Sequence, residues 1–596
     1  MKIAVFFRCF FQWILIAAML CLFGIAFAET APSTNKTPIT IKIIGLPKGD
    51  MLTNVQNQLS ISAKQLGNNP SRLSVINLYH SSPKAIQQAM SPYGYFRPHI
   101  QSSIQMIGSR QWILQYTIEQ GDPVMLITVD VSVTGAGAND PAFQALVKNF
   151  PSQPGAILNT VLYERGKSSL SDLAVKRGYF NALMVENKVS VNLLTEEARI
   201  HIHFETGDRF RFGKTQFDST YFDPKFLERY LNYTPDEYYD ATKISALQDH
   251  LSSSGYFNNI NIHPGLNPDI LKSQKPVPIT IHLTPSPSRQ YQIGSGYGTD
   301  TGIRGLAGLT MRHLTPTGDK FSTFLYASQA YKSNSINHYL VSNFDVPGKD
   351  PVTQQYEVGF GAGEQTLPQG TYNNFKTSLA YSTQMGMVKQ TSSVTYLNEN
   401  YNIPALFPGY LKAQDLISAI NWTIRSADDT LNPTQGYFLG LKLAGTSTSM
   451  LSQNNIFQAD FSAKYLRTFY YDYRMILRSE ASATAINTLN DLPYSMQLFA
   501  GGANSVRGYG YQSLGPGRYL VVSSIELQRR IVGNWYLAGF WDAGSVSRNI
   551  QSQLQQGAGP GLLWLSPIGP VELTVAHALY NKQAHWMVQF AMGPTL

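Results

Sequence analysis

The sequence predicts three small α+β modules followed by a transmembrane antiparallel β-barrel of about sixteen strands. A Gly-Tyr-Phe tripeptide recurs about every 80 residues in the first half of the chain, which indicates a tandem repeat. In the second half, polar and apolar residues alternate almost to the last residue, a pattern typical of strands. The composition agrees, because 12% aromatic and 14% charged residues favour strands and turns over charged surface helices.

The first residues of the chain predict an exported protein. Lys2 and Arg8 lie at the start of an apolar run that ends at Ala26-Phe27-Ala28, a small-x-small cleavage site, so we expect a signal peptide over residues 1–28. An uncleaved anchor helix is the weaker alternative, because a polar segment follows the site. Both cysteines of the chain lie in this segment, so we expect no disulfide in the mature chain. The net charge of +8 is not gathered in a basic stripe, and no nucleic-acid partner is expected.

The repeated tripeptide marks the place where a helix ends and a strand begins. Apolar residues fall at helical spacing before the second and third copies, and a glycine just after such a stripe can end the helix in the left-handed conformation. Alternating strands follow each copy. We therefore expect each module to contain a strand, helices and two further strands, over residues 29–122, 123–207 and 208–286; the copies are Gly94-Tyr95-Phe96, Gly178-Tyr179-Phe180 and Gly255-Tyr256-Phe257.

Two histidines at period two raise the question of a metal site. His201 and His203 would point to the same side of a strand, as metal ligands do. No third ligand lies near them in the sequence, and polar residues on an exposed sheet face are ordinary. We expect no metal here and no cofactor anywhere in the chain.

Residues 287–596 have the pattern of a membrane barrel. Leu439, Leu441 and Leu443 share one strand face with Tyr437, while Lys442 points to the other face. Lipid outside and water inside would impose this alternation. After the first thirty residues no apolar stretch is long enough for a spanning helix, so a membrane protein of this sequence must be a barrel. A soluble β-sandwich is the alternative that this alternation disfavours.

Two motifs near the end of the chain are specific. The first is Val506-Arg507-Gly508-Tyr509, in a glycine-rich segment, and the second is Phe540-Trp541-Asp542-Ala543-Gly544. In this order, and behind a tandem of small modules, they resemble the Omp85 superfamily, in which the first motif lies on a loop folded back into the barrel and the second lies on the strand that receives it. The resemblance implies that the modules are POTRA domains. Three of them before the barrel are most similar to the TamA branch of the superfamily.

Strand parity gives the two motifs a physical interpretation. If Asp542 faces the lumen, Phe540 does too, and Glu526 faces inward on the preceding strand. The family pattern places both acids within reach of Arg507, and an arginine inside a barrel needs a carboxylate. We therefore expect a loop lock made of Val506, Arg507, Gly508, Tyr509, Glu526, Phe540, Asp542 and Gly544. The alternative is a solvated arginine in an outer loop.

The two ends of the barrel predict a weak seam. The first strand carries Gly294, Gly296 and Gly298 at alternate positions, which pack little and destabilise a strand. The closing strand, expected from Trp586 to Met592 and including Phe590, must pair with it. A poor seam can expose a strand edge to which a client strand adds by β-augmentation.

No nucleophile elbow, zinc motif or phosphate-binding loop is present in the sequence, so we expect no enzyme. The family resemblance implies an outer-membrane protein with periplasmic modules. It would insert client outer-membrane proteins, autotransporters among them, into the lipid bilayer together with a TamB-like inner-membrane protein that docks on the modules. The alternatives are the outer-membrane end of a phospholipid-transport bridge, which would keep the modules, and a passive channel, which would not require them.

Overall fold

The computed structural model describes residues 39–592, apart from 68, 108–110, 219–220, 274, 300–301, 330–335, 430–431, 471, 550–552, 568 and 580–585. The predicted signal peptide, with Ala26 and Ala28, lies outside the described residues. The chain divides into two compact units, residues 1–210 and 211–596. Within the described residues, no helix is long and apolar enough to cross a membrane.

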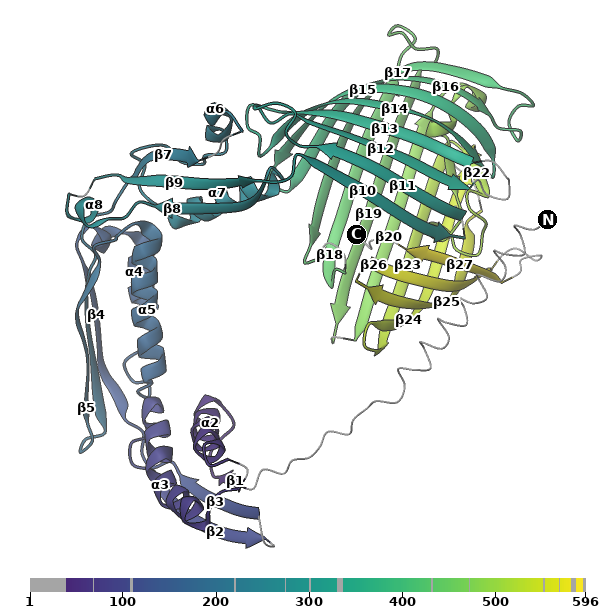
Figure 1. Ribbon diagram of the computed structural model, residues 1–596. Coiled ribbons are helices and arrows are strands. Elements are labelled where there is room, and N and C mark those ends of the chain that lie inside the picture. Colours follow the sequence, from purple (N-terminus) through teal and green to yellow (C-terminus); the bar gives the residue numbers. More distant parts are fainter. Residues whose placement is uncertain are drawn as a thin grey trace. The chain divides into compact units, whose positions relative to one another are not determined.

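The first unit contains two modules of the same topology (Figure 1). In each, the third strand lies in the middle of the sheet, parallel to the first strand and antiparallel to the second. The elements of the first module are β1 (Ile39–Ile44), α2 (Asp50–Lys64), α3 (Arg72–Met90), β2 (His99–Ile107) and β3 (Gln111–Glu119). Those of the second are β4 (Met125–Thr134), α4 (Pro141–Lys148), α5 (Thr160–Arg177), β5 (Leu183–Asn192) and β6 (Glu197–Glu205).

The middle strand of each sheet supplies the core, as its alternation predicts. Leu114, Tyr116 and Ile118 on β3 are buried against the helices, and so are Ile200 and Phe204 on β6. A face that alternates in this way can bury its apolar side chains only under a layer of helices. The helices of each module therefore cover the apolar face of its third strand.

The third module opens the second unit and is fastened to the barrel. Its elements are β7 (Phe212–Asp218), α6 (Pro224–Glu228), α7 (Ala241–Ser253), β8 (Phe257–Pro264), α8 (Pro268–Ser273) and β9 (Val277–Pro285), in the sheet order β7-β9-β8. The Tyr256 hydroxyl donates to the carbonyl of Gly318, in the turn between the second and third barrel strands. Arg229 donates to the carbonyls of Pro347 and Gly348 in the following turn of the same rim.

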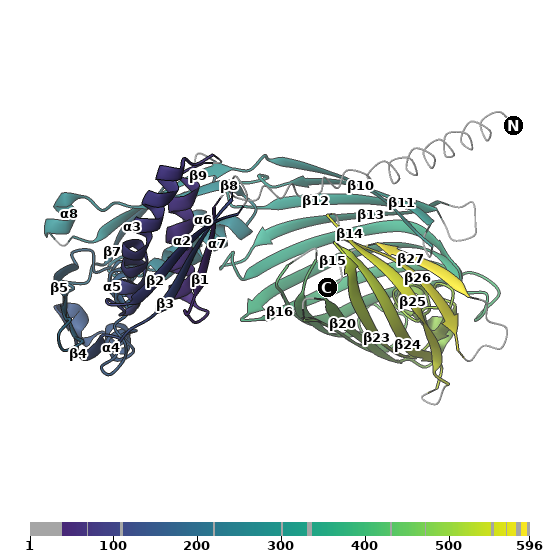
Figure 2. The ribbon, with the colours of Figure 1, turned by 90° about the horizontal axis from the view of Figure 1, so that it is seen from below.

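The rest of the second unit is one antiparallel sheet of 16 strands that curls into a barrel (Figures 1 and 2). The strands are β10 (Arg289–Gly298), β11 (Gly302–Met311), β12 (Lys320–Gln329), β13 (Ile336–Pro347), β14 (Gln354–Leu367), β15 (Gly370–Met385), β16 (Val388–Asn402), β17 (Leu411–Ala427), β18 (Gln435–Thr446), β19 (Ile456–Phe469), β20 (Tyr473–Ala485), β23 (Tyr519–Val532), β24 (Trp535–Ser547), β25 (Gln555–Ser566), β26 (Gly569–Ala578) and β27 (Met587–Met592). The prediction of three small α+β modules before an antiparallel barrel of about sixteen strands is confirmed.

Alternation assigns the two faces of the barrel wall. Leu537 and Trp541 on β24 are exposed on the outside, while Ala538, Phe540 and Asp542, which lie between or beside them, are buried inside. Successive side chains of a strand point to opposite faces, so one register decides both sets. The outer face of β24 is therefore apolar, and its inner face carries the carboxylate of Asp542.

Candidate functional site

The candidate site is a loop that joins β20 to β23 and folds into the lumen. This loop contains short helices at Leu489–Asp491 and Tyr494–Met496 and a two-stranded hairpin, β21 (Leu498–Ala500) and β22 (Leu514–Gly517). Val506 and Tyr509 are buried in a small apolar cluster with Leu520 and Val522 of β23. The loop tip thus has its own core against the inner wall, which fixes the position of the residue between them.

Arg507 is at the centre of the tip, and its side chain is 1% exposed. Its Nε and Nη2 donate to the two carboxylate oxygens of Asp542 at 2.8 and 2.9 Å, and its backbone N–H donates to Asp542 at 3.0 Å. Nη1 donates to Glu526 at 2.6 Å. The structure therefore brings together Arg507, Glu526 and Asp542, three residues that the sequence placed in one lock. A fork of this kind holds a guanidinium in one orientation.

Two further contacts complete the surroundings of this guanidinium. Its carbon lies 3.5 Å from the centre of the Phe540 ring, so the charge stacks on an aromatic face. A third carboxylate, Glu572 on β26, accepts from Nη1 at 3.0 Å. Sequence reasoning missed Glu572, because no motif surrounds it; its inward parity on β26 is the only signal that could have suggested it.

Glycines let the loop backbone lie directly on the wall. A side chain at Gly544 would place its Cβ 2.6 Å from Cγ2 of Val506, and one at Gly557 would place it 1.8 Å from the carbonyl oxygen of Arg507. Gly508 has φ of +90°, in the left-handed region, and its own Cβ would meet the backbone of β26 at 3.0 Å. Gly544, which closes the second motif, is therefore needed because Val506 packs directly over it.

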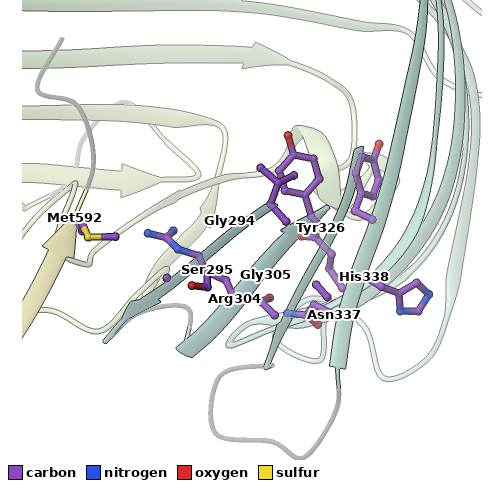
Figure 3. A pocket seen from close by; sticks show the side chains of 14 residues that line it. Gly294, Ser295, Arg304, Gly305, Tyr326, Asn337, His338 and Met592 are labelled. Atoms are coloured by element: carbon purple, nitrogen blue, oxygen red, sulfur yellow. The ribbon is translucent and has the colours of Figure 1, made fainter. Parts of the chain in front are cut away.

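The seam is the second feature of the site. Gly294 and Gly296 of β10 line a cavity of about 450 Å³ together with Ser295, Arg304 and Met592. Figure 3 shows Met592 facing Ser295 and Arg304 across this cavity. The structure thus brings two of the three seam glycines to one cavity with the closing strand.

The closing strand is shorter than predicted and differs in its pairing. β27 starts at Met587, and in the described part of the chain no ladder joins it to β10. The Phe590 N–H donates to Oγ1 of Thr299 at 3.1 Å, and the Phe590 ring lies 6.4 Å from that of Tyr297. Glycines offer no side chains to pack across this gap, which explains why the expected pairing is reduced to these contacts.

The remaining predicted residues lie apart from the loop. Gly298 is buried at the end of β10, and Trp586, which precedes β27, is exposed beside His577. His203 bonds to Ser132 and Thr134 within its own module. Among the residues that the structure describes, no group of three His, Cys, Asp or Glu side chains could hold a metal ion.

Comparison with known proteins gives matches over most of the chain. Residues 290–595 match the Omp85 superfamily domain, residues 40–120 match the POTRA domain TamA domain 1, and residues 210–286 match the surface antigen variable number repeat, a POTRA family. The outer membrane protein assembly factor BamA of Neisseria meningitidis serogroup B is 22% identical over 429 residues, which are 60% of this chain. The match spans 53% of that relative, about half its length.

The solved structure of a BamA barrel shows the same fold. BamA from Haemophilus ducreyi lacking POTRA domains 1–3 superimposes with a TM-score of 0.65 at 15% identity, covering 79% of this chain and 100% of that one. CdiB from Acinetobacter baumannii has a TM-score of 0.46 at 12% identity, covering 91% of this chain and 99% of that one.

Proposed function

The chain belongs to the Omp85 superfamily, and on this premise we propose that it inserts client β-barrel proteins, autotransporters among them, into the outer membrane through the seam between β10 and β27. The protein lies in the outer membrane with its POTRA modules in the periplasm. The match of its first module to the TamA family supports a TamA-type role within the superfamily.

The observation that carries the proposal is the incomplete seam. A closed barrel normally removes its strand edges, whereas β10 has a ladder partner on one side only among the described residues. Its unpaired N–H and C=O groups are a template for an incoming strand. Ile293, on the outer face of β10, is 90% exposed, so its apolar side chain is free to pack against an added strand.

The loop lock serves this function by holding the wall strands that lead up to the closing edge. Asp542 and Glu526 come from β24 and β23, and Arg507 joins them from the lumen. A buried pair of this kind adds little net stability but fixes geometry. The wall is thus held as far as β26, and β27 is the strand at which the seam can part.

We further propose that the periplasmic modules receive a TamB-like inner-membrane partner. Each module sheet has its first and second strands at the edges, where a partner strand can add. Client folding, and not a covalent reaction, would drive insertion, so no enzymatic activity is part of the proposal.

The test is a reversible seam lock. Cysteines at Ser295 and Met592 face each other across the cavity and can be joined by oxidation or by a short thiol cross-linker. The matched control joins Ser479 to Ser523, which lie opposite each other on β20 and β23 with their hydroxyls 3.3 Å apart, away from the seam. Both variants are reconstituted in vesicles and given an unfolded autotransporter client.

We expect the Ser295–Met592 link to abolish client insertion and reduction to restore it, while the Ser479–Ser523 link has no effect. Insertion that continues through a sealed seam contradicts the proposal. Phospholipid transfer that persists with the seam sealed would then favour the transport-bridge alternative, and steady ion conductance would favour the passive channel.

A further inference from the structure

The inward loop contacts a continuous set of strands that ends at the seam. Arg507 bonds to Glu526 on β23, Asp542 on β24 and Glu572 on β26. The Tyr509 hydroxyl donates to Gln555 on β25 at 2.9 Å. Four adjacent strands of the wall are therefore tied to one loop tip.

The fifth strand of this set is β27, and a single side chain, Gln589, joins it to the loop. Gln589 faces the lumen and is 1% exposed. Its Oε1 accepts from the N–H of Gly508 at 3.2 Å, and its Nε2 donates to the carbonyl of Tyr509 at 3.2 Å. The amide group of Gln589 thus makes two hydrogen bonds with the loop backbone, one with the N–H of Gly508 and one with the carbonyl of Tyr509.

These bonds matter because β27 has few others. It pairs with β26 over six residues, from Met587 to Met592, and has no ladder on its other side within the described residues. A strand held on one edge over so short a length is marginal by itself. The amide of Gln589 adds a second point of attachment, directed inward and independent of the seam.

We propose that Gln589 is the latch that holds the closing strand to the inward loop, so that release of this side chain frees β27 to move away from β10. The inference deepens the proposed function, because it names the residue that would control the opening of the same seam. Glu572 fastens the neighbouring strand β26 to Arg507, so β27 is the first strand that can leave without breaking the ion pairs.

The experiment measures β27 directly, without a client. Spin labels are attached through cysteines at Val588 on β27 and Leu441 on β18, both exposed on the outer face, and their distance distribution is recorded by pulsed electron paramagnetic resonance. The two native cysteines, Cys9 and Cys21, lie in the predicted signal peptide. A second label pair, Ile293 and Leu441, reports on β10 in the same way.

Two variants remove the latch. Gln589→Leu keeps the size of the side chain without its amide, and Gln589→Asn keeps the amide but shortens its reach. Gln555→Leu is the matched control, because it removes a glutamine contact with the same loop on a strand away from the seam. Heat-dependent gel mobility confirms that each barrel is folded before it is measured.

Loss of two hydrogen bonds should raise the ratio of released to held β27 about thirtyfold. We expect a new, broader component in the Val588–Leu441 distribution for both Gln589 variants, and none for Gln555→Leu or for the Ile293–Leu441 pair. A wild-type distribution in folded Gln589 variants overturns the latch, and so does equal broadening in Gln555→Leu. Because no client is present, this result is independent of the seam-lock assay, and either proposal can fail alone.

Discussion

Neutralising Asp542 tests the lock most severely. Asp542 is 0% exposed and accepts three hydrogen bonds from Arg507, so Asp542→Asn removes a charge and leaves the shape almost unchanged. The remaining buried guanidinium loses its bidentate partner. An amide at this position has one acceptor oxygen for the Nε, Nη2 and backbone N–H groups of Arg507, so buried donors lose their acceptor at a cost of about 3–5 kcal/mol, although Nη1 keeps Glu526 and Glu572. We expect a loss of barrel stability of this size.

Neutralising Glu572 should have a much smaller effect. Three carboxylates, Glu526, Asp542 and Glu572, surround Arg507, and the second cation within salt-bridge distance is Arg478, 3.8 Å from Glu526. Three negative charges therefore face two positive ones, so Glu572→Gln removes an excess charge and keeps an acceptor for Nη1. We expect a change below about 1 kcal/mol.

The assay is unfolding of the full chain in detergent micelles, followed by tryptophan fluorescence and by heat-dependent gel mobility. The matched control is Asp415→Asn, which neutralises another 0% exposed carboxylate of the barrel whose hydrogen-bond donors are the backbone N–H groups of Gln453 and Asn454. Equal destabilisation by the substitutions at Asp542, Glu572 and Asp415 would refute the argument, since burial and not the ion pair would then explain the loss.

Three further predictions concern other parts of the chain. Burial alone would raise the pKa of Asp140, but a backbone N–H of α4 and the Arg177 guanidinium hold this pKa below its usual value. The ionised Asp140 therefore stabilises the fold above about pH 4, and this contribution is lost as the pH falls below that. Asp140→Asn should flatten the acid limb of the stability curve of the POTRA unit, and an unchanged limb would contradict this. Gly544→Ala forces a Cβ against Val506 and should destabilise the barrel by about 1–3 kcal/mol, of which Val506→Ala restores a part in a double-mutant cycle. Tyr256→Phe leaves a carbonyl of the β11–β12 turn without its donor and should speed hydrogen exchange there about tenfold, whereas unchanged exchange would show that this bond does not hold the third module.

Most of the fold could be predicted because it depends on local periodicity. Alternation with period two decides which face of a strand is apolar, and the same parity placed Glu526 and Asp542 inside the barrel before any contact was known. Glu572 and Gln589 have the same inward parity, yet nothing in the sequence distinguishes them from other inward polar residues. Their roles follow from closure of the sheet, which brings β26 and β27 to a loop 65 and 81 residues earlier in the chain.

The sequence predicted a weak seam in which the closing strand pairs with β10, and among the described residues no ladder joins the two strands. Gly294 and Gly296, the glycines from which the weak seam was predicted, line a cavity together with Met592. The short closing strand also limits the pairing, because β27 has six residues against ten in β10 and could cover only part of that edge. The strand lengths are set by the turns and the loop contacts, which sequence alternation does not report.

The Gly-Tyr-Phe repeat has a use that its spacing alone did not reveal. In the first copy the carbonyl of Gly94 accepts a hydrogen bond from the N–H of Val124, and in the second the carbonyl of Gly178 accepts one from Phe210, so the turn that ends the helix also receives the chain as it leaves the module. In the third copy the carbonyl of Tyr256 takes this part, and its hydroxyl reaches the barrel. The glycine of each copy has positive φ, which ends the preceding helical segment and redirects the chain. The repeat therefore marks the places where the chain leaves each module. At the last of these places the hydroxyl of Tyr256 fastens the third module to the barrel wall.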